Sequence, residues 1–427
     1  MALSLEQTVS SSSFLPMNHQ WQPISGGITA PQGFQAAGIT AGLKLSGKPD
    51  LALLLAPAGA ACAGTFTTNQ MRAGCVDLCA QRLQQNQGSA RAVLINSGQA
   101  NACTGDLGLI DSLRATKALA DQLGLIEEEV LICSTGVIGV PIPMDLLLAG
   151  INPLVDSLAA SPTAAIAAAA AILTTDLVDK TIAIEAQLGD QIVRLGGMAK
   201  GSGMIHPDMA TMLAFVSCDA GLPPAEWQAM LHRVVDESFN AITVDGDVST
   251  NDCLLAFAAG PQLAERYWPD LEAGLAKLCE YLARAITRDG EGATCVIEVV
   301  VEGTETNNQA RCIARTVCGS SLVKTAIHGR DPNWGRIVAA AGRAGVQFNP
   351  EAVQLWIGPH KLLENGQPLN FDRAAVGLYL EEKETGIYLE TDQVDIHLVV
   401  GSGLGSGRGW GCDLSAQYVS INADYTT

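Results

Sequence analysis

The sequence predicts a layered α/β protein whose strands and helices fall into two blocks. Of its 427 residues, 48% are hydrophobic and 16% are charged, so the chain can bury a large core. Short β-branched runs bounded by Gly, Pro and Asn alternate with segments of helical periodicity. We expect a flexible N-terminal segment over 1–24, a main layered domain over 25–305 and a smaller C-terminal α/β domain over 306–427.

The first elements of the main domain read as strands that end in small polar loops. Short apolar runs separated by Gly, Pro and Asn indicate strands between residues 28 and 76. A strand over 92–95 runs into the loop NSGQANACTG, a helix is expected over about 107–123, and a strand over 130–133 ends in Ser134-Thr135-Gly136. Strand ends that open into such loops are common places for functional sites.

The next elements include one helix with a clear start signal. Ser161 followed by Pro162 predicts an N-cap and a first helical residue, and the alanine-rich helix should reach about residue 173. The later elements expected here are strands over 181–188, 191–195, 211–217 and 295–303, and helices over 224–238 and 271–288. In the tail, Gly at alternate positions over 401–411 superficially resembles a dinucleotide-binding fingerprint, but Ser406 occupies the place of its third glycine. We therefore expect a flexible segment or one where backbones approach closely.

Charge and composition exclude several classes of partner. With 25 basic and 44 acidic residues, the net charge of −19 has the wrong sign for binding nucleic acid or an anionic membrane surface. The longest apolar run, 164–173, is much shorter than the ~20 residues of a membrane-spanning helix. Because no Lys or Arg precedes Lys44, the N-terminus resembles neither a signal nor a transit peptide. We therefore expect a cytoplasmic chain.

Common catalytic and metal-binding motifs are missing from the sequence. Gly47-Lys48 is followed by proline, so it is no phosphate-binding P-loop. The six His form no H-E-x-x-H pair and the twelve Cys no C-x-x-C pair, so we expect buried free thiols and neither a metal nor another cofactor. The acidic run 245–250 lacks calcium-loop spacing. Without a G-x-S-x-G elbow, acyl chemistry would need a nucleophile other than a Ser–His pair.

The segment KGSGMIHPDMATML, residues 200–213, allows two interpretations. It can be a turn that feeds a core strand, since Thr is common in strands. Alternatively, Thr211 can attack the carbonyl of Ala210 and cut the chain, which frees the α-amine of Thr211. That amine, with an unperturbed pKa of about 7.7–8.0, could take the hydroxyl proton without a His. Thr135 and Gly136 would then offer a hydroxyl and a backbone N–H to an oxyanion.

This segment and nine others resemble the ornithine acetyltransferase family, the glutamate N-acetyltransferases of arginine biosynthesis. The resemblance runs from about residue 27 to 427. The other segments are TAPQGFQAAG, GTFTTN, INSGQANACTG, STGVIG, TTDLVDK, VDGDVSTNDC, DGEGAT, VKTAIHGRDPNWGRI and WGCDLS with YVSINADYTT. It implies a self-cleaving αββα sandwich with a smaller C-terminal α/β domain.

The resemblance also implies a reaction: transfer of acetyl from N2-acetylornithine to glutamate through an acetyl ester on Thr211. Cleavage would fall between Ala210 and Thr211, and the α and β chains would form an α2β2 assembly. Thr135 and Gly136 take the oxyanion-hole role, and the implied substrate contacts are Thr174, Lys200, Thr211, Glu291, Asn422 and Thr427. Acetyl-CoA is a possible second acetyl donor.

The residue types suit these ligands. Lys200 can pair with an amino-acid carboxylate and Glu291 with the side-chain ammonium of ornithine, while Asn422 and Thr427 can orient polar groups. A docked C-terminus is required for Thr427 to contribute.

Two departures from the family pattern bear on the shape of the substrate pocket. They are Leu177, where a small hydroxyl residue is expected, and the glycine-rich run 405–409.

Two alternatives remain open from the sequence. One is a related self-cleaving amidase or aminopeptidase with water as acceptor, and the other is a non-catalytic protein that binds a small ligand.

Overall fold

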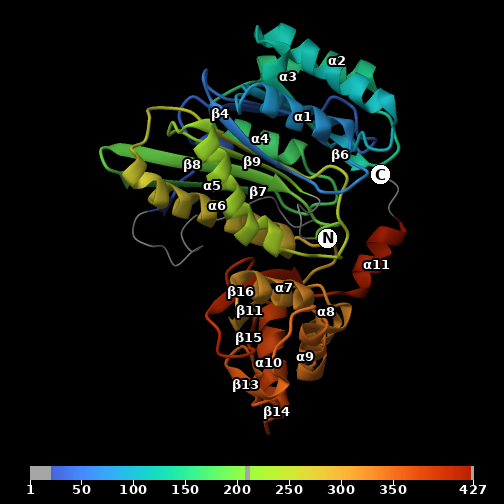
Figure 1. Cartoon of the computed structure of the whole chain (residues 1–427). Coiled ribbons are helices and arrows are strands. Elements are labelled where there is room, and N and C mark those ends of the chain that lie inside the picture. The colour runs from blue at the N-terminus through green and yellow to red at the C-terminus, as the bar shows by residue number, and fades with distance from the viewer. Residues whose placement is uncertain (1–20, 207–211, 425–427) are drawn as a thin grey trace.

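The main part of the chain is built on two stacked β-sheets (Figure 1). The computed structural model describes residues 21–206 and 212–424, so most of the N-terminal segment expected over 1–24 lies outside the described residues. The first sheet has the order β1 (Gln22–Pro23), β7 (Lys180–Leu188), β8 (Gln191–Lys200), β9 (Leu213–Cys218), β10 (Cys253–Ala258) and β4 (Ala61–Phe66). The second has the order β2 (Gln35–Ile39), β3 (Leu51–Leu55), β5 (Ala92–Gln99) and β6 (Val130–Val137).

The two sheets share an apolar core between their facing surfaces. Leu54, Val93 and Ile95 of the second sheet belong to one buried cluster with Phe215 and Leu255 of the first. Helices cover the outer faces of both sheets (Figure 1). The αββα sandwich implied by the family resemblance is therefore present in the structure.

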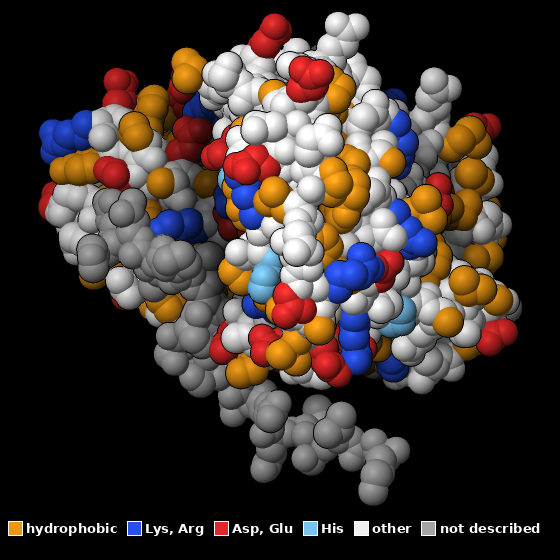
Figure 2. All heavy atoms as spheres, turned by 90° about the horizontal axis from the view of Figure 1, so that it is seen from below, with side chains coloured by type: hydrophobic (Ala, Val, Ile, Leu, Met, Phe, Trp, Pro, Cys, Tyr) orange, Lys and Arg blue, Asp and Glu red, His pale blue; other side chains and the backbone are white. Residues whose placement is uncertain are grey.

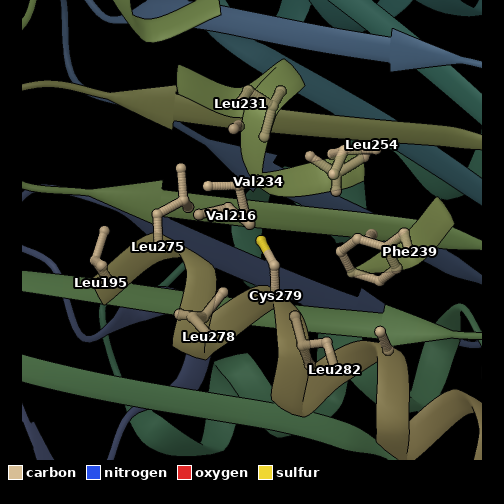
Figure 3. Close-up of a cluster of buried hydrophobic side chains, with 14 of the residues drawn as sticks. Leu195, Val216, Leu231, Val234, Phe239, Leu254, Leu275, Leu278, Cys279 and Leu282 are labelled. Carbon is tan, nitrogen blue, oxygen red and sulfur yellow. The ribbon is translucent and has the colours of Figure 1, made fainter. Parts of the chain in front are cut away.

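Two helices cover the outer face of the first sheet. They are α5 (Pro224–Glu237) and α6 (Trp268–Arg288), as predicted, although α6 begins three residues earlier than expected. Figure 3 shows Leu275, Leu278 and Leu282 of α6 among side chains from the strands and from α5. Because these leucines are fully buried, their burial is a main source of stability for this layer.

Substitution of Leu278 by alanine should destabilise the protein by about 2–5 kcal/mol, because the cavity left in this layer adds to the lost transfer free energy. Leu278 is 0% exposed. Thermal unfolding should show a clearly lower Tm for this variant. Leu378→Ala is the control, since that side chain is 57% exposed and its truncation should leave Tm nearly unchanged.

Three helices cover the outer face of the second sheet. The helix predicted over about 107–123 is α2 (Asp106–Leu123). Helices α1 (Gly74–Gln85) and α3 (Met144–Asp156) were not predicted from the sequence. The first residues of α1 lie in the region 28–76, where strands were predicted. All three helices contribute to one buried cluster with β3, β5 and β6.

The alanine-rich helix α4 (Pro162–Ala171) lies against β2. Its predicted start is correct, since the Ser161 hydroxyl accepts a hydrogen bond from the amide of Ala164 at 3.2 Å. The helix approaches β2 so closely that a Cβ on Gly38 would lie 2.0 Å from the carbonyl oxygen of Ala167. Alanine and glycine at this contact allow the helix to pack beside the strand.

A third sheet forms the lower part of the molecule in Figure 1. Its order is β14 (Gln367–Pro368), β13 (His360–Glu364), β12 (Gln354–Ile357), β15 (Gln393–Val399), β11 (Val296–Thr304) and β16 (Gly405–Cys412). The helices of this region are α7 (Asn307–Cys318), α8 (Ser321–His328), α9 (Trp334–Gly342), α10 (Arg373–Glu384) and α11 (Ala416–Ala423). Strand β11 precedes residue 306, so this sheet contains residues from both sides of the domain boundary expected between 305 and 306. That boundary stays a prediction.

The glycine-rich tail forms the edge strand β16, where backbones approach closely as predicted. A Cβ on Gly407 would lie 2.6 Å from the backbone nitrogen of Arg311 in α7. The run 405–409 therefore packs closely against α7.

On the surface shown in Figure 2, basic and acidic side chains are interspersed. Within the residues that the structure describes, no helix combines the length and apolar character needed to cross a membrane. Ten of the twelve cysteines are buried and all are free thiols, as predicted from the sequence.

Candidate active site

One cavity of about 260 Å³ brings together the site residues predicted from distant parts of the sequence. Its lining includes Thr135, Gly136, Thr174, Lys200, Glu291 and Asn422. These residues come from β6, from the segment after α4, from β8, from the loop before β11 and from α11. The remaining predicted residues, Ala210, Thr211 and Thr427, lie outside the described residues.

The end of β6 presents Thr135 and Gly136 to the cavity. β6 runs parallel to β5, and Gly136 pairs with Gly98. A Cβ on Gly136, which has φ 131°, would lie 2.3 Å from the carbonyl carbon of Gly98, so only glycine fits here. Among the residues that the structure describes, the Thr135 hydroxyl has no hydrogen-bond partner, which leaves it available to a ligand.

A buried asparagine, which the sequence did not single out, fixes the backbone before Thr135. The Asn251 side-chain amide donates hydrogen bonds to the carbonyl oxygens of Ser134 at 2.9 Å and of Ala100 at 2.5 Å. The Ser134 hydroxyl in turn donates to Asn96 at 2.7 Å. These bonds hold the peptide that joins Ser134 to Thr135 in one orientation, so the donors at the end of β6 are preorganised.

Lys200 is the last residue of β8 and pairs with Leu213 of β9. Leu213 follows Thr211 by two residues in the sequence. The strand predicted over 191–195 thus continues to residue 200. The Lys200 side chain is buried, with its Nζ 3.9 Å from Oδ2 of Asp176. Burial lowers the pKa of the Lys200 ammonium, while the Asp176 carboxylate opposes this shift.

Glu291 and Asn422 meet at another part of the cavity lining. The Asn422 side-chain amide donates a 2.7 Å hydrogen bond to Glu291 Oε2, and the Ser415 hydroxyl donates to the carbonyl oxygen of Gly292 at 2.7 Å. Gly203 has no room for a Cβ, which would lie 2.5 Å from Glu291 Oε2. Helix α11 is thus docked beside Glu291.

A buried carboxyl contacts the residue that follows Thr211. Oδ1 of Asp252 accepts a hydrogen bond from the backbone nitrogen of Met212 at 2.8 Å. Burial raises the pKa of the Asp252 carboxyl well above its usual range. This contact fixes the start of β9 in the sheet beside Lys200.

Two sequence features lie beside the cavity: Leu177 is outside its lining, whereas the acidic run 245–250 contributes Ser249 and Thr250 to it. The side chain of Leu177 is 82% exposed, and its backbone nitrogen donates to Asp289 at 3.0 Å. The carboxylate of Asp245, in the acidic run 245–250, accepts hydrogen bonds from the backbone nitrogens of Met204 and Ile205. That run therefore acts as a turn that holds the loop after Lys200.

This arrangement suits a small ligand that carries charges of both signs. The lining combines a buried ammonium on Lys200, a carboxylate on Glu291 and neutral donors at Thr135 and Gly136. Such a set can bind a carboxylate and an ammonium of one amino acid and leave the neutral donors for a developing oxyanion.

Comparison with known proteins gives a consistent result. The ArgJ family matches residues 35–427. A protein of Prochlorococcus marinus (strain MIT 9313), named arginine biosynthesis bifunctional protein ArgJ, is 68% identical and is covered over 95% of both chains. The protein of that name from Parasynechococcus marenigrum (strain WH8102) is 65% identical over 96% of this chain and 98% of its own.

Among solved structures, the ArgJ protein of Bacillus halodurans is 40% identical, with a TM-score of 0.46 over 49% of this chain and 98% of its own. A chain of ornithine acetyltransferase from Mycobacterium tuberculosis, solved in complex with ornithine, is 42% identical. Its TM-score is 0.41 over 44% of this chain and 98% of its own.

Proposed function

Since the chain belongs to the ArgJ family and is an acyltransferase of arginine biosynthesis, we propose that its cavity transfers acetyl from N2-acetylornithine to glutamate through Thr211. The observation that carries this proposal is the set of groups around the cavity. A buried cation, a carboxylate, the Thr135 hydroxyl and the backbone of Gly136 line it together, and β9, which begins at Leu213, pairs with Lys200 in the sheet beside them.

The charged side chains determine how the donor would lie. Lys200 pairs with the carboxylate of N2-acetylornithine, and Glu291 pairs with its side-chain ammonium. Asn422 keeps Glu291 in place through their 2.7 Å hydrogen bond. Thr174 lines the same cavity and can orient a polar end of the ligand, as can Thr427, which lies outside the described residues. The acetamide group is then directed to Thr135 and Gly136.

The first half-reaction begins when the Thr211 hydroxyl oxygen attacks the acetyl carbonyl carbon. The α-amine of Thr211, free after cleavage at Ala210, accepts the hydroxyl proton. The N–H of Gly136 and the hydroxyl of Thr135 stabilise the oxyanion of the tetrahedral intermediate. When the C–N bond breaks, the proton passes to the leaving α-amine of ornithine, and the acetyl group remains on Thr211 as an ester.

The second half-reaction reverses these steps with glutamate. The α-amine of glutamate attacks the ester carbonyl, the same donors hold the oxyanion, and the C–O bond breaks as Thr211 regains its proton. N-acetylglutamate leaves. Because one acyl-enzyme serves both substrates, the kinetics should be ping-pong.

Three further features belong to this proposal. The chain cleaves itself between Ala210 and Thr211, and the two products remain together in a cytoplasmic α2β2 assembly. Acetyl-CoA serves as a second acetyl donor to glutamate, which the word bifunctional in the names of the relatives supports. Purified protein supplied with acetyl-CoA and glutamate should then form N-acetylglutamate and free CoA.

A simple assay tests the proposed transfer. Release of ornithine from N2-acetylornithine should depend on glutamate, with one N-acetylglutamate formed for each ornithine released. Steady release of acetate without any need for glutamate would instead indicate an amidase that uses water.

Substitution of Glu291 by glutamine should raise the KM for N2-acetylornithine by about 10- to 100-fold, because a charge-assisted hydrogen bond to the ammonium is lost. The KM for glutamate should change much less, since its side chain carries no ammonium. Steady-state kinetics with each substrate varied in turn measures both values. Glu298→Gln is the control, because Glu298 lies in the third sheet and contacts Trp410. An equal rise in both KM values for Glu291→Gln would contradict the assigned contact.

A further inference from the structure

A buried carboxylate, Asp176, connects Thr174 and Lys200 of the cavity wall with the backbone that follows Lys200. Its Oδ2 accepts a 2.9 Å hydrogen bond from the backbone nitrogen of Thr174 and lies 3.9 Å from Nζ of Lys200. Its Oδ1 accepts a 2.6 Å hydrogen bond from the backbone nitrogen of Gly201. One side chain thus holds Thr174, the Lys200 ammonium and the backbone that follows Lys200.

A second lysine balances the charge of Asp176. Nζ of Lys180 lies 2.8 Å from Asp176 Oδ1 and 2.6 Å from Asp289 Oδ2, and the Lys180 and Asp176 side chains are 0% exposed. Burial opposes the charged form of Lys180, but the two carboxylates outweigh it and raise the pKa of the ammonium. Burial likewise opposes the charged form of Asp176, but Lys180 and Lys200 lower the pKa of its carboxyl.

Hydrogen bonds of Ser202 link the segment after Lys200 to the segment that carries Glu291. The Ser202 hydroxyl donates a 2.6 Å hydrogen bond to the carbonyl oxygen of Asp289. The backbone nitrogen of Glu291 donates to the carbonyl oxygen of Ser202 at 2.9 Å. The segment that carries Lys200 and the segment that carries Glu291 are therefore joined directly through Ser202, and the Asp289 side chain of the second segment also pairs with Lys180.

The charge state of Lys200 depends on several neighbours. The groups that face it are Asp176, Lys180, Asp252, Glu291 and Lys44. Asp176 favours the ammonium most strongly, whereas burial, Lys180 and Lys44 disfavour it. Asp252 favours the ammonium less than Asp176 does, and burial raises the pKa of its own carboxyl. The cation that the substrate carboxylate needs thus depends mainly on Asp176.

We propose that Asp176 is a positioning residue that keeps Lys200 protonated and aimed at the substrate carboxylate, and that Lys180 limits how strongly it does so. The proposal rests on the function assigned to Lys200 above. Lys180 pairs with the same carboxylate and also repels the Lys200 ammonium. The pH at which Lys200 loses its proton therefore depends on both Asp176 and Lys180. Binding of the carboxylate should be lost as the pH rises through the pKa of Lys200.

Two substitutions should move this pH in opposite directions. Asp176→Asn removes the nearest counter-charge and leaves Lys180 paired with Asp289, so the pKa of Lys200 should fall by about 1–3 units. Lys180→Met removes a repelling cation and frees Asp176 to act on Lys200, so the pKa of Lys200 should rise. A purely structural role would weaken both variants without such opposite shifts.

The test is the affinity for L-ornithine measured by calorimetry between about pH 6 and 10 on the full-length cleaved protein. Ornithine titrates identically in every experiment, so differences between variants report the protein. Asp219→Asn is the control, since Asp219 is a buried carboxylate that contacts Arg194 and Gln32. The pH at which the affinity for ornithine falls should be lower than in the wild type for Asp176→Asn and higher for Lys180→Met. It should be unchanged for Asp219→Asn.

The inference would be overturned if the affinity of Asp176→Asn fell at the same pH as that of the wild type. It would also be overturned if this pH shifted in the same direction in both variants. If one variant does not fold, the direction of shift in the other still decides. Because binding is measured without turnover, a wild-type protein that binds ornithine but transfers no acetyl would refute the proposed function and leave this test intact.

Discussion

Replacement of Thr211 by alanine should give a single uncut chain with no detectable acetyl transfer. The hydroxyl of Thr211 is the proposed nucleophile both for cleavage at Ala210 and for the transfer, and alanine offers no atom that can take either part. Denaturing electrophoresis should show one band of 427 residues in place of two fragments, and the ornithine-release assay should give only background.

Thr211→Ser is the matched control, because it keeps a hydroxyl and loses only a methyl group. It should be cleaved and should retain part of the activity. An uncut Thr211→Ala protein with normal activity would refute both roles, while a cut but inactive one would show that another nucleophile opens the chain.

Removal of the Thr135 hydroxyl should give the second largest effect. Thr135→Ala should lower kcat by about 10²- to 10³-fold with little change in KM, because an oxyanion donor acts mainly in the transition state. The hydroxyl is available for this role, since no described residue bonds to it. Kinetics should be measured on the cleaved fraction, because the same donors could assist self-cleavage.

Thr135→Ser restores the hydroxyl and should recover most of the lost rate. Circular dichroism should show that both variants keep the wild-type fold. An unchanged kcat in Thr135→Ala would remove Thr135 from the oxyanion hole.

Elements with local start signals could be predicted from the sequence, and elements without them could not. Ser161-Pro162 marked the start of α4, and the hydroxyl of Ser161 caps it. By contrast, the side chain of Ala73 cannot cap α1, and α3 contains Pro153, which argues against a helix. Both of these helices are stabilised by their packing on the second sheet.

The extent of β8 shows how tertiary contacts override a local pattern. Gly196 and Gly197 read as the end of a strand, yet the strand continues to Lys200. A Cβ on Gly196 would lie 2.2 Å from the carbonyl oxygen of Gly27, so glycine is required by packing rather than by a turn. This extension places Lys200 at the cavity.

The predicted site residues and the residues that support them lie in segments that resemble the family, but the contacts between these segments could not be predicted from the sequence. Thr135, Gly136, Lys200 and Glu291 each lie in a segment that resembles the family. Asp176 meets Lys180 in one such segment, but Lys180 also meets Asp289, which is 109 residues further along the chain. Contacts of this kind depend on how the sheets stack, so a single sequence does not contain a direct signal for them.

Intact mass spectrometry of the purified protein tests cleavage before Thr211 and acetyl transfer through Thr211 in one experiment. Two masses should appear, one for residues 1–210 and one for residues 211–427, and brief exposure to N2-acetylornithine without glutamate should add one acetyl group to the second alone. A single mass for the whole chain in a fully active preparation, or an acetyl group on the first fragment, would contradict the account.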